Sequence, residues 1–180
     1  MQKKIQITLL PATYKEKSFE IDLRQELHLM ITGIPDADRK MIFDAISEQL
    51  LAMPDTDVKK IDITEENAES QMRTIFQELE NRYHAMAKLG MGTIENYNQM
   101  SANNWHYIVV LINYHPVNEI DDLICKLAQK GRAAGIHLIL ESSTTPPPRI
   151  CFSFPTRFEI SENEATLISY GKKCERRNLH

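Results

Sequence analysis

The sequence is short of glycine, which limits the ligand-binding loops that it can contain. Six of its 180 residues are glycine, whereas average usage of about 7% would give about 13. Loops that hold phosphate groups depend on glycine, because successive backbone N–H groups converge on an anion most easily in conformations that glycine adopts. Such a loop could therefore lie only near one of six positions: Gly33, Gly90, Gly92, Gly131, Gly135 and Gly171.

Cysteine and long apolar runs are scarce as well. The three cysteines are Cys125, Cys151 and Cys174, and their wide, odd-numbered spacing argues against a disulfide framework or a zinc ribbon. The longest strongly apolar run, residues 107–112, is too short to span a bilayer. Too few apolar residues follow the first four for a signal peptide. These features predict a cytoplasmic protein with no membrane segment.

Length and charge are those of an ordinary globular domain. We expect one domain over residues 1–180, with N-terminal strands in 1–26, a core in 27–160 and a C-terminal tail in 161–180. The chain has 21 basic and 25 acidic residues, for a net charge of −4. This balance argues against a broad surface for nucleic acid or anionic membrane, although a local one is still compatible with it.

Strand-like and helix-like segments alternate along the chain, which is typical of an α/β fold with a mostly parallel sheet. The apolar patterns predict strands at residues 5–10, 19–23, 27–32, 58–63, 107–112, 136–140 and 150–154. Helices are expected from about residue 35 to Pro54, from Thr64, as N-cap, to a stop at Gly90, and from Asn118 onward. Ligands of such sheets bind beyond the carboxyl ends of the strands, where Gly33, Asn113 and Glu141 lie.

Four stretches together resemble the motor domain of the FtsK/SpoIIIE family of DNA translocases. They are HLMITG at 28–33, ENRYHAMAKLGMGTIENYNQ at 80–99, YIVVLI at 107–112 and LAQKGRAAGIHLIL at 127–140. The second is similar to the family pattern E-x-R-Y-x-x-M-x-x-x-G, and the fourth to A-x-K-x-R-A-A-G-I-H-L-x-L. The resemblance implies a RecA-like P-loop NTPase fold, reduced in size, in a family that forms hexameric rings and moves DNA with ATP.

The nucleotide-site positions depart from that family. A phosphate loop of the form G-x-x-x-x-G-K-[ST] would begin at Gly33, but Asp38 replaces the second glycine, Arg39 the lysine and Lys40 the hydroxyl residue. Pro35 has no N–H to offer. Asp36 and Asp38 place carboxylates where phosphates would lie, and like charges 4 Å apart repel by about 4 kcal/mol at an effective dielectric constant of 20.

In that family, acidic residues at the end of the strand that corresponds to 107–112 bind magnesium and polarise the attacking water. This sequence lacks them. Asn113 and Tyr114 follow the strand at 107–112, and neither is an anionic ligand or a base at neutral pH. The resemblance therefore leaves four degenerate nucleotide-site positions, Gly33, Arg39, Lys40 and Asn113. It gives no catalytic residue, no metal site and no expected cofactor.

Several basic residues are candidates for contacts with a partner or with DNA. As part of an exposed first helical turn, Arg39 and Lys40 are expected to be solvated, with an anion contact as the alternative. By resemblance, Arg82 would have a subunit-interface or nucleotide-adjacent role, and Arg132 would face a neighbouring subunit. Arg82 could equally pair with Glu78 one helical turn away, and Arg132 could equally bind carbonyls at a helix end. The tail carries four more candidates, Lys172, Lys173, Arg176 and Arg177, for which a solvated segment is the plainer expectation.

Two functional hypotheses from different classes follow, together with a variant of the first. The first is an FtsK/SpoIIIE-like module that has lost ATP hydrolysis and binds an intact FtsK-type motor, duplex DNA or further copies of itself. The second is an ATP-dependent DNA translocase that uses ATP and Mg²⁺ at an atypical site, with Arg39 or Lys40 in place of the usual lysine. The variant is an assembly factor in a mixed ring, where a neighbour supplies the catalytic residues.

Overall fold

A seven-stranded sheet forms the centre of the computed structural model. The structure describes residues 5–9, 18–33, 36–102, 104–116, 118–161, 164–169 and 172–178, and for 118 and 172–178 it describes the backbone alone. The strand order is β4-β5-β6-β3-β7-β8-β9. Five neighbouring strands run parallel to one another: β4 (Thr56–Asp62), β5 (Tyr107–Tyr114), β6 (Ile136–Ser142), β3 (Leu29–Gly33) and β7 (Thr156–Ile160). The mostly parallel sheet expected from the sequence is confirmed.

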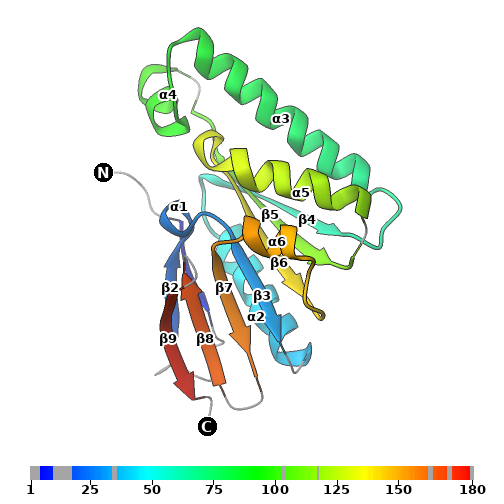
Figure 1. The fold of residues 1–180 in the computed structure, drawn as a ribbon. Helices are drawn as coiled ribbons and strands as arrows, with labels where there is room; N and C mark the ends of the chain where they lie inside the picture. The colour runs from blue at the N-terminus through cyan, green and yellow to red at the C-terminus, as the bar shows by residue number, and fades with distance from the viewer. Residues whose placement is uncertain are drawn as a thin grey trace.

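Helices cover both faces of this sheet (Figure 1). One face carries α3 (Ala68–Lys88), α4 (Ile94–Met100), α5 (Asn118–Lys130) and α6 (Pro148–Ser153). The other face carries α2 (Asp36–Leu51), the short α1 (Leu23–Glu26) and a two-stranded antiparallel sheet of β1 (Gln6–Leu9) and β2 (Phe19–Asp22). A 3-10 helix, η2 (Gly131–Ala134), leads from α5 into β6. The molecule therefore has two apolar cores, one on each side of the sheet.

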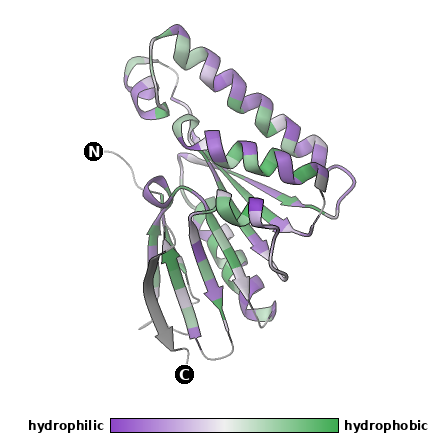
Figure 2. Ribbon diagram, viewed as in Figure 1, coloured by the Kyte–Doolittle hydropathy of each residue, from purple (hydrophilic) through white to green (hydrophobic). Residues whose placement is uncertain are grey.

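The central strands are apolar on both faces because they contribute to both cores. In β5, Val110 and Ile112 lie in the core under α3 and α5, and Val109 and Leu111 lie in the core over α2. All four are fully buried. Figure 2 shows this apolar composition along the inner strands and the mixed composition of the covering helices. The expectation that residues 107–112 form a strand covered on both faces is confirmed.

Helix α3 starts later than its sequence suggests. Thr64, expected to be the N-cap, belongs to a turn in which its N–H and hydroxyl donate to Asp62 Oδ1 at 2.9 and 2.6 Å. The helix begins at Ala68, after Asn67. The prediction of the cap was wrong because a strong aspartate acceptor at the end of β4 captures the threonine locally. The predicted stop is confirmed, since Gly90 has a φ of +66° just beyond α3.

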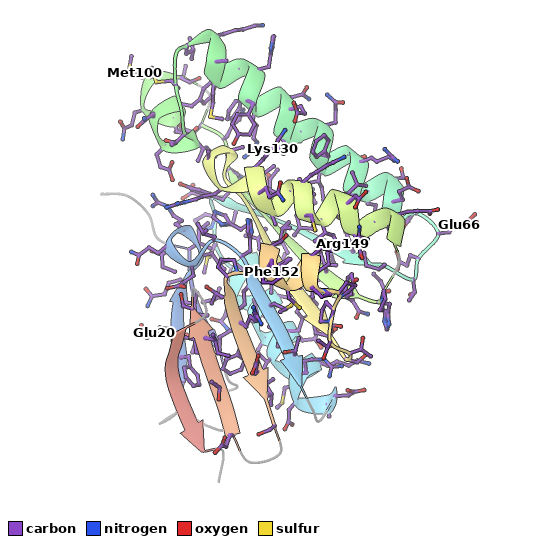
Figure 3. The ribbon with its side chains drawn as sticks, viewed as in Figure 1. Glu20, Glu66, Met100, Lys130, Arg149 and Phe152 are labelled. Atoms are coloured by element: carbon purple, nitrogen blue, oxygen red, sulfur yellow. The ribbon has the colours of Figure 1, made fainter. Side chains whose placement is uncertain are left out.

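Residues 150–154 form no strand. Helix α6 occupies Pro148–Ser153, with Pro147 and Pro148 at its start. Ile150 and Phe154 are buried, whereas Phe152, labelled in Figure 3, is 84% exposed. The prediction of a strand was wrong because an apolar run this short fits a strand and a turn and a half of helix equally well. A helix starts here because proline suits the first helical position, where it needs no N–H partner.

The C-terminal segment extends the sheet instead of forming a tail. β8 (Glu164–Ser169) pairs antiparallel with β7, and β9 (Lys172–Asn178) pairs antiparallel with β8. The expectation of a C-terminal tail over residues 161–180 is therefore wrong for residues 164–169 and 172–178, which are strands of the sheet. The side chains of Lys172, Lys173, Arg176 and Arg177 lie outside the part of the chain that the structure describes.

His28 joins the start of β3 to two other elements. It is 1% exposed. The Leu138 N–H donates to its Nδ1 at 3.0 Å, and its Nε2 lies 2.8 Å from the Ala128 carbonyl oxygen. The second contact requires an N–H at Nε2, so the neutral ring satisfies both partners. Burial, and secondly the charge of His137, lower the pKa of His28 from 6.5 to about 3.

This histidine should make the fold sensitive to acid. The folded-state pKa lies below the unfolded one, so the stabilisation is complete above pH 6.5 and is lost as the pH falls towards 3. Between pH 7 and pH 5 the free energy of unfolding should fall by about 2 kcal/mol through His28 alone. Urea unfolding at a series of pH values measures this slope. His28→Gln should flatten it and exposed His84→Gln should not; a slope unchanged in His28→Gln would contradict the assignment.

Gly33 ends β3 in a conformation that only glycine tolerates well. Its φ is +113°, and a Cβ at this position would collide with the backbone of Ile160 in β7. Gly33→Ala should lower the free energy of unfolding by at least about 2 kcal/mol. Gly92→Ala is the matched control, since a Cβ there meets nothing within 4 Å, and should change stability by no more than about 0.5 kcal/mol. Equal denaturation midpoints for the two variants would contradict the close approach.

Candidate functional site

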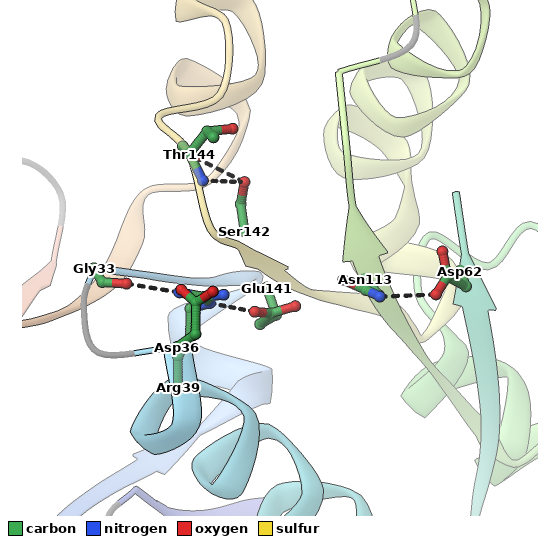
Figure 4. Close-up of polar contacts among 8 residues, drawn as sticks. All are labelled: Gly33, Asp36, Arg39, Asp62, Asn113, Glu141, Ser142 and Thr144. Atoms are coloured by element: carbon green, nitrogen blue, oxygen red, sulfur yellow. Dashed lines mark hydrogen bonds and ion pairs between the residues drawn. The ribbon is translucent and has the colours of Figure 1, made fainter. Parts of the chain in front are cut away.

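The carboxyl ends of three parallel strands meet at one edge of the sheet, together with the start of α2. The sheet register places Glu141 of β6 beside Asn113 of β5 on one side and Ile31 of β3 on the other. Gly33 ends β3, and α2 starts at Asp36. Polar side chains from separate segments therefore gather here, as Figure 4 shows.

Arg39 lies inside this edge and not in solvent. It is 1% exposed. Its Nη1 donates to the Gly33 carbonyl oxygen at 2.7 Å and to Asp36 Oδ1 at 2.8 Å, and its Nε donates to the carboxylate of buried Glu141. The expectation of a solvated Arg39 is wrong because a buried carboxylate on the neighbouring strand offers it a partner. The hydrogen bond from Arg39 also lowers the pKa of exposed Asp36.

This arrangement turns the charge of Arg39 inward. The acceptors that it contacts are a backbone carbonyl and two carboxylates, all from the protein itself. In a phosphate loop the corresponding cation and the helix N-terminus are directed at the ligand. Here the guanidinium binds the end of β3, the first residue of α2 and β6, and Lys40, the next residue along α2, is exposed.

Asn113 uses its side chain to hold a neighbouring strand. Its Nδ2 donates to Asp62 Oδ2 at 2.8 Å, and Asp62 Oδ1 accepts from Thr64. Hydrogen bonds from the Thr64 hydroxyl, then its N–H, keep the pKa of Asp62 below its usual value. The structure thus places Gly33 and Arg39 together, whereas Asn113 contacts Asp62 instead of the Arg39 cluster.

Sequence reasoning placed Glu141 at this edge but missed its burial and its pairing with Arg39. Glu141 is 3% exposed and is the buried partner of Arg39. The available signal was its position directly after the apolar run of β6. An acidic residue there is unlikely to be buried unpaired, so a basic partner could have been sought. The sequence alone does not say that this partner is Arg39, 102 positions away.

The two interface candidates behave differently. Arg82 is 4% exposed; its Nε donates to Glu78 Oε1 at 2.8 Å and its Nη1 to the Ala134 carbonyl oxygen at 2.9 Å. The pairing with Glu78 is confirmed, and the buried guanidinium links α3 to η2. Arg132 is exposed and borders a cavity with His137.

Two further classes of feature are absent from the described residues. None of their helices combines the length and apolarity that a membrane crossing requires. They also contain no group of three or more histidine, cysteine, aspartate or glutamate side chains placed to hold a metal ion.

Comparison with known proteins finds DNA translocases among the relatives. The chain is 25% identical over 154 residues to DNA translocase SftA of Bacillus subtilis, covering 67% of this chain and 16% of that protein. It is 26% identical over 189 residues to DNA translocase FtsK of Streptococcus pneumoniae, covering 83% and 24%. For FtsK of Oceanobacillus iheyensis the identity is 31% over 137 residues, covering 65% and 17%. No family model matches the chain.

Solved structures share the fold at low sequence identity. The pCW3 conjugation coupling protein TcpA, solved with ATPγS, superposes with a TM-score of 0.80 at 16% identity, covering 99% of this chain and 66% of that one. The cytoplasmic domain of EssC superposes with a TM-score of 0.69 at 14% identity, covering 89% and 37%. The chain is thus homologous to FtsK/SpoIIIE-family DNA translocases over most of its length, and it spans 16–24% of the first curated relatives.

The Arg39–Glu141 pair should be sensitive to removal of one partner. Arg39→Met leaves Glu141 as an unpaired buried charge, which costs about 3–5 kcal/mol of unfolding free energy. Arg39→Met with Glu141→Leu should recover much of that loss, because no charge is then left buried. Chemical denaturation of the two single variants and the double variant measures the coupling.

Arg73→Met is the control for this series. Arg73 pairs with Glu69 one turn along α3, and the two side chains are 67% and 42% exposed. Removing an exposed pair of this kind should cost less than about 1 kcal/mol. A loss in Arg39→Met no larger than in Arg73→Met would show that the buried pair is not an important contact.

Proposed function

We propose that this chain is a non-catalytic relative of FtsK/SpoIIIE-type motors that neither binds nor hydrolyses ATP efficiently. It would act as a structural module that binds a partner or DNA. The observation that carries the proposal is the position of Arg39. Its guanidinium is buried against Gly33, Asp36 and Glu141, so its charge is already neutralised within the protein.

The geometry supports this proposal in two further ways. Asp36 stands in the first turn of α2 with its carboxylate held by Arg39, and negative charge at a helix N-terminus occupies the position that an anion would otherwise take. At the end of β5, Asn113 donates to Asp62. A neutral amide committed to this contact offers neither a base nor an anionic magnesium ligand.

The proposed partners are an intact FtsK-type motor or duplex DNA, with self-association as a further possibility, and the proposed location is the cytoplasm. The support is the homology to proteins named as DNA translocases and the likeness to the cytoplasmic domain of EssC. In the 127–140 segment, the basic residue that we singled out for a contact with a partner or with DNA is Arg132, and its side chain is exposed.

Nucleotide titration tests the proposal directly. Calorimetry with ATP and Mg²⁺ should detect no binding tighter than about 1 mM, because the cation needed for the phosphates is paired internally. Hydrolysis should stay at background with and without duplex DNA. Micromolar affinity, or turnover stimulated by DNA, would reject the non-catalytic assignment and favour a translocase with an atypical site.

Variants identify the residue responsible if any nucleotide binding is found. Under the translocase alternative, Arg39→Ala with Lys40→Ala removes the binding. Lys88→Ala with Lys126→Ala is a control of equal charge change, because the two lysines are exposed residues of α3 and α5, away from the α2 start. Light scattering at several protein concentrations, with and without duplex DNA, then separates a monomer from a ring-forming protein.

A further inference from the structure

A second candidate site lies at the opposite end of the sheet from Arg39. A cavity of about 480 Å³ is bounded by α1, the start of α4, η2 and the first residues of β6. Most of its lining is polar or charged, and the residues important here are Asp22, Arg24, Thr93, Glu95, Arg132 and His137. Its volume lies in the range of small-molecule sites, about 300–1,000 Å³.

Three of the four charged groups in this lining are engaged within the protein. Arg24 Nη2 lies 3.1 Å from Glu95 Oε1, and the Tyr107 hydroxyl donates to the same oxygen at 2.8 Å. Asp22 Oδ1 accepts from the Arg24 N–H at the start of α1 and from the Ile5 N–H. Arg24 and Glu95 therefore neutralise each other, and backbone N–H groups hold the Asp22 carboxylate, so these contacts fix the cavity wall.

Arg132 is the fourth charge, and it is different. It is exposed at the cavity rim, and within the described part of the chain its guanidinium makes no ion pair or side-chain hydrogen bond. A guanidinium offers five N–H donors in a planar fork that fits a carboxylate in bidentate geometry. The cavity therefore presents one uncommitted cation to an anionic group.

His137 lines the same cavity and carries a buried acceptor atom. The residue is 1% exposed, and its Nδ1 lies 2.8 Å from the Leu27 carbonyl oxygen. That contact requires the hydrogen on Nδ1, so the neutral ring carries a lone pair on Nε2. Among the described residues Nε2 is buried without a hydrogen-bond partner, which is uncommon for a buried polar atom and costs stability until a donor pairs with it.

We propose that this cavity binds a small hydroxycarboxylate, whose carboxylate pairs with Arg132 and whose hydroxyl donates to His137 Nε2. The donor is a hydroxyl because the ring is almost fully covered, and a single small group reaches it with the least displacement of its neighbours. This site is independent of the proposed loss of ATP binding. His137 and Glu141 are four residues apart in β6, about 13 Å along the strand.

L-malate is the probe, and succinate, which lacks the hydroxyl, is its matched control. Calorimetry on the full chain should show malate binding with a dissociation constant of about 1 mM or tighter. Succinate should bind about threefold or more weakly, because it leaves Nε2 unpaired. In two-bond ¹H–¹⁵N spectra of the histidine side chains, malate should shift the Nε2 resonance of His137, and succinate should leave it in place.

Two variants of equal charge change separate the site from general attraction of anions. Arg132→Gln should weaken malate binding about tenfold or more, whereas Lys126→Gln on α5 should leave it unchanged. Because both residues are exposed, neither change should prevent folding. Each of four results would overturn the proposal: no malate binding, equal affinity for succinate, full affinity in Arg132→Gln, or an equal loss in Lys126→Gln.

Discussion

A buried ion pair between Arg39 and Glu141 holds helix α2 against the edge where the parallel strands end. Removing two charges from water costs several kcal/mol for each ion, and only good geometry and additional hydrogen bonds offset this cost. The additional contacts here are those of Arg39 with Gly33 and Asp36. The pair therefore does more to fix where α2 begins relative to β3 and β6 than to add net stability.

In parallel α/β sheets, the carboxyl ends of the strands usually bind a ligand. In this chain the side chains of that region pair with one another instead. The acceptors of β3, α2 and β6 converge on one guanidinium, and on the next strand Asn113 is committed to Asp62. The fold beneath is shared with TcpA, with a TM-score of 0.80. Under the proposed function, a small number of side chains at the carboxyl ends of the strands would distinguish this chain from a motor, because Arg39 and Asn113 are paired within the protein.

Much of the architecture could be predicted because the spacing of apolar residues along an element agrees with the residues that end it. The buried run of β5, the apolar stripe of α3 and the stop at Gly90 are local signals that tertiary contacts reinforce. The errors arise where local signals compete or partners are distant. Thr64 was captured by Asp62, residues 150–154 are too few to show a period, and the burial of Arg39 depends on a carboxylate 102 positions away. The direction in which the Arg39 side chain points could therefore not be predicted from the sequence that follows Gly33.

The position of β3 has a consequence for biosynthesis. This strand comes early in the chain, at residues 29–33, yet it pairs with β6 at 136–142 and β7 at 156–160. A ribosome must therefore deliver more than a hundred further residues before the middle of the sheet can close. Contacts of such long range slow folding, because loop-closure entropy is lost before they form. The apolar strand β3 must stay unpaired until those residues have been made, which exposes it to chaperones and to aggregation.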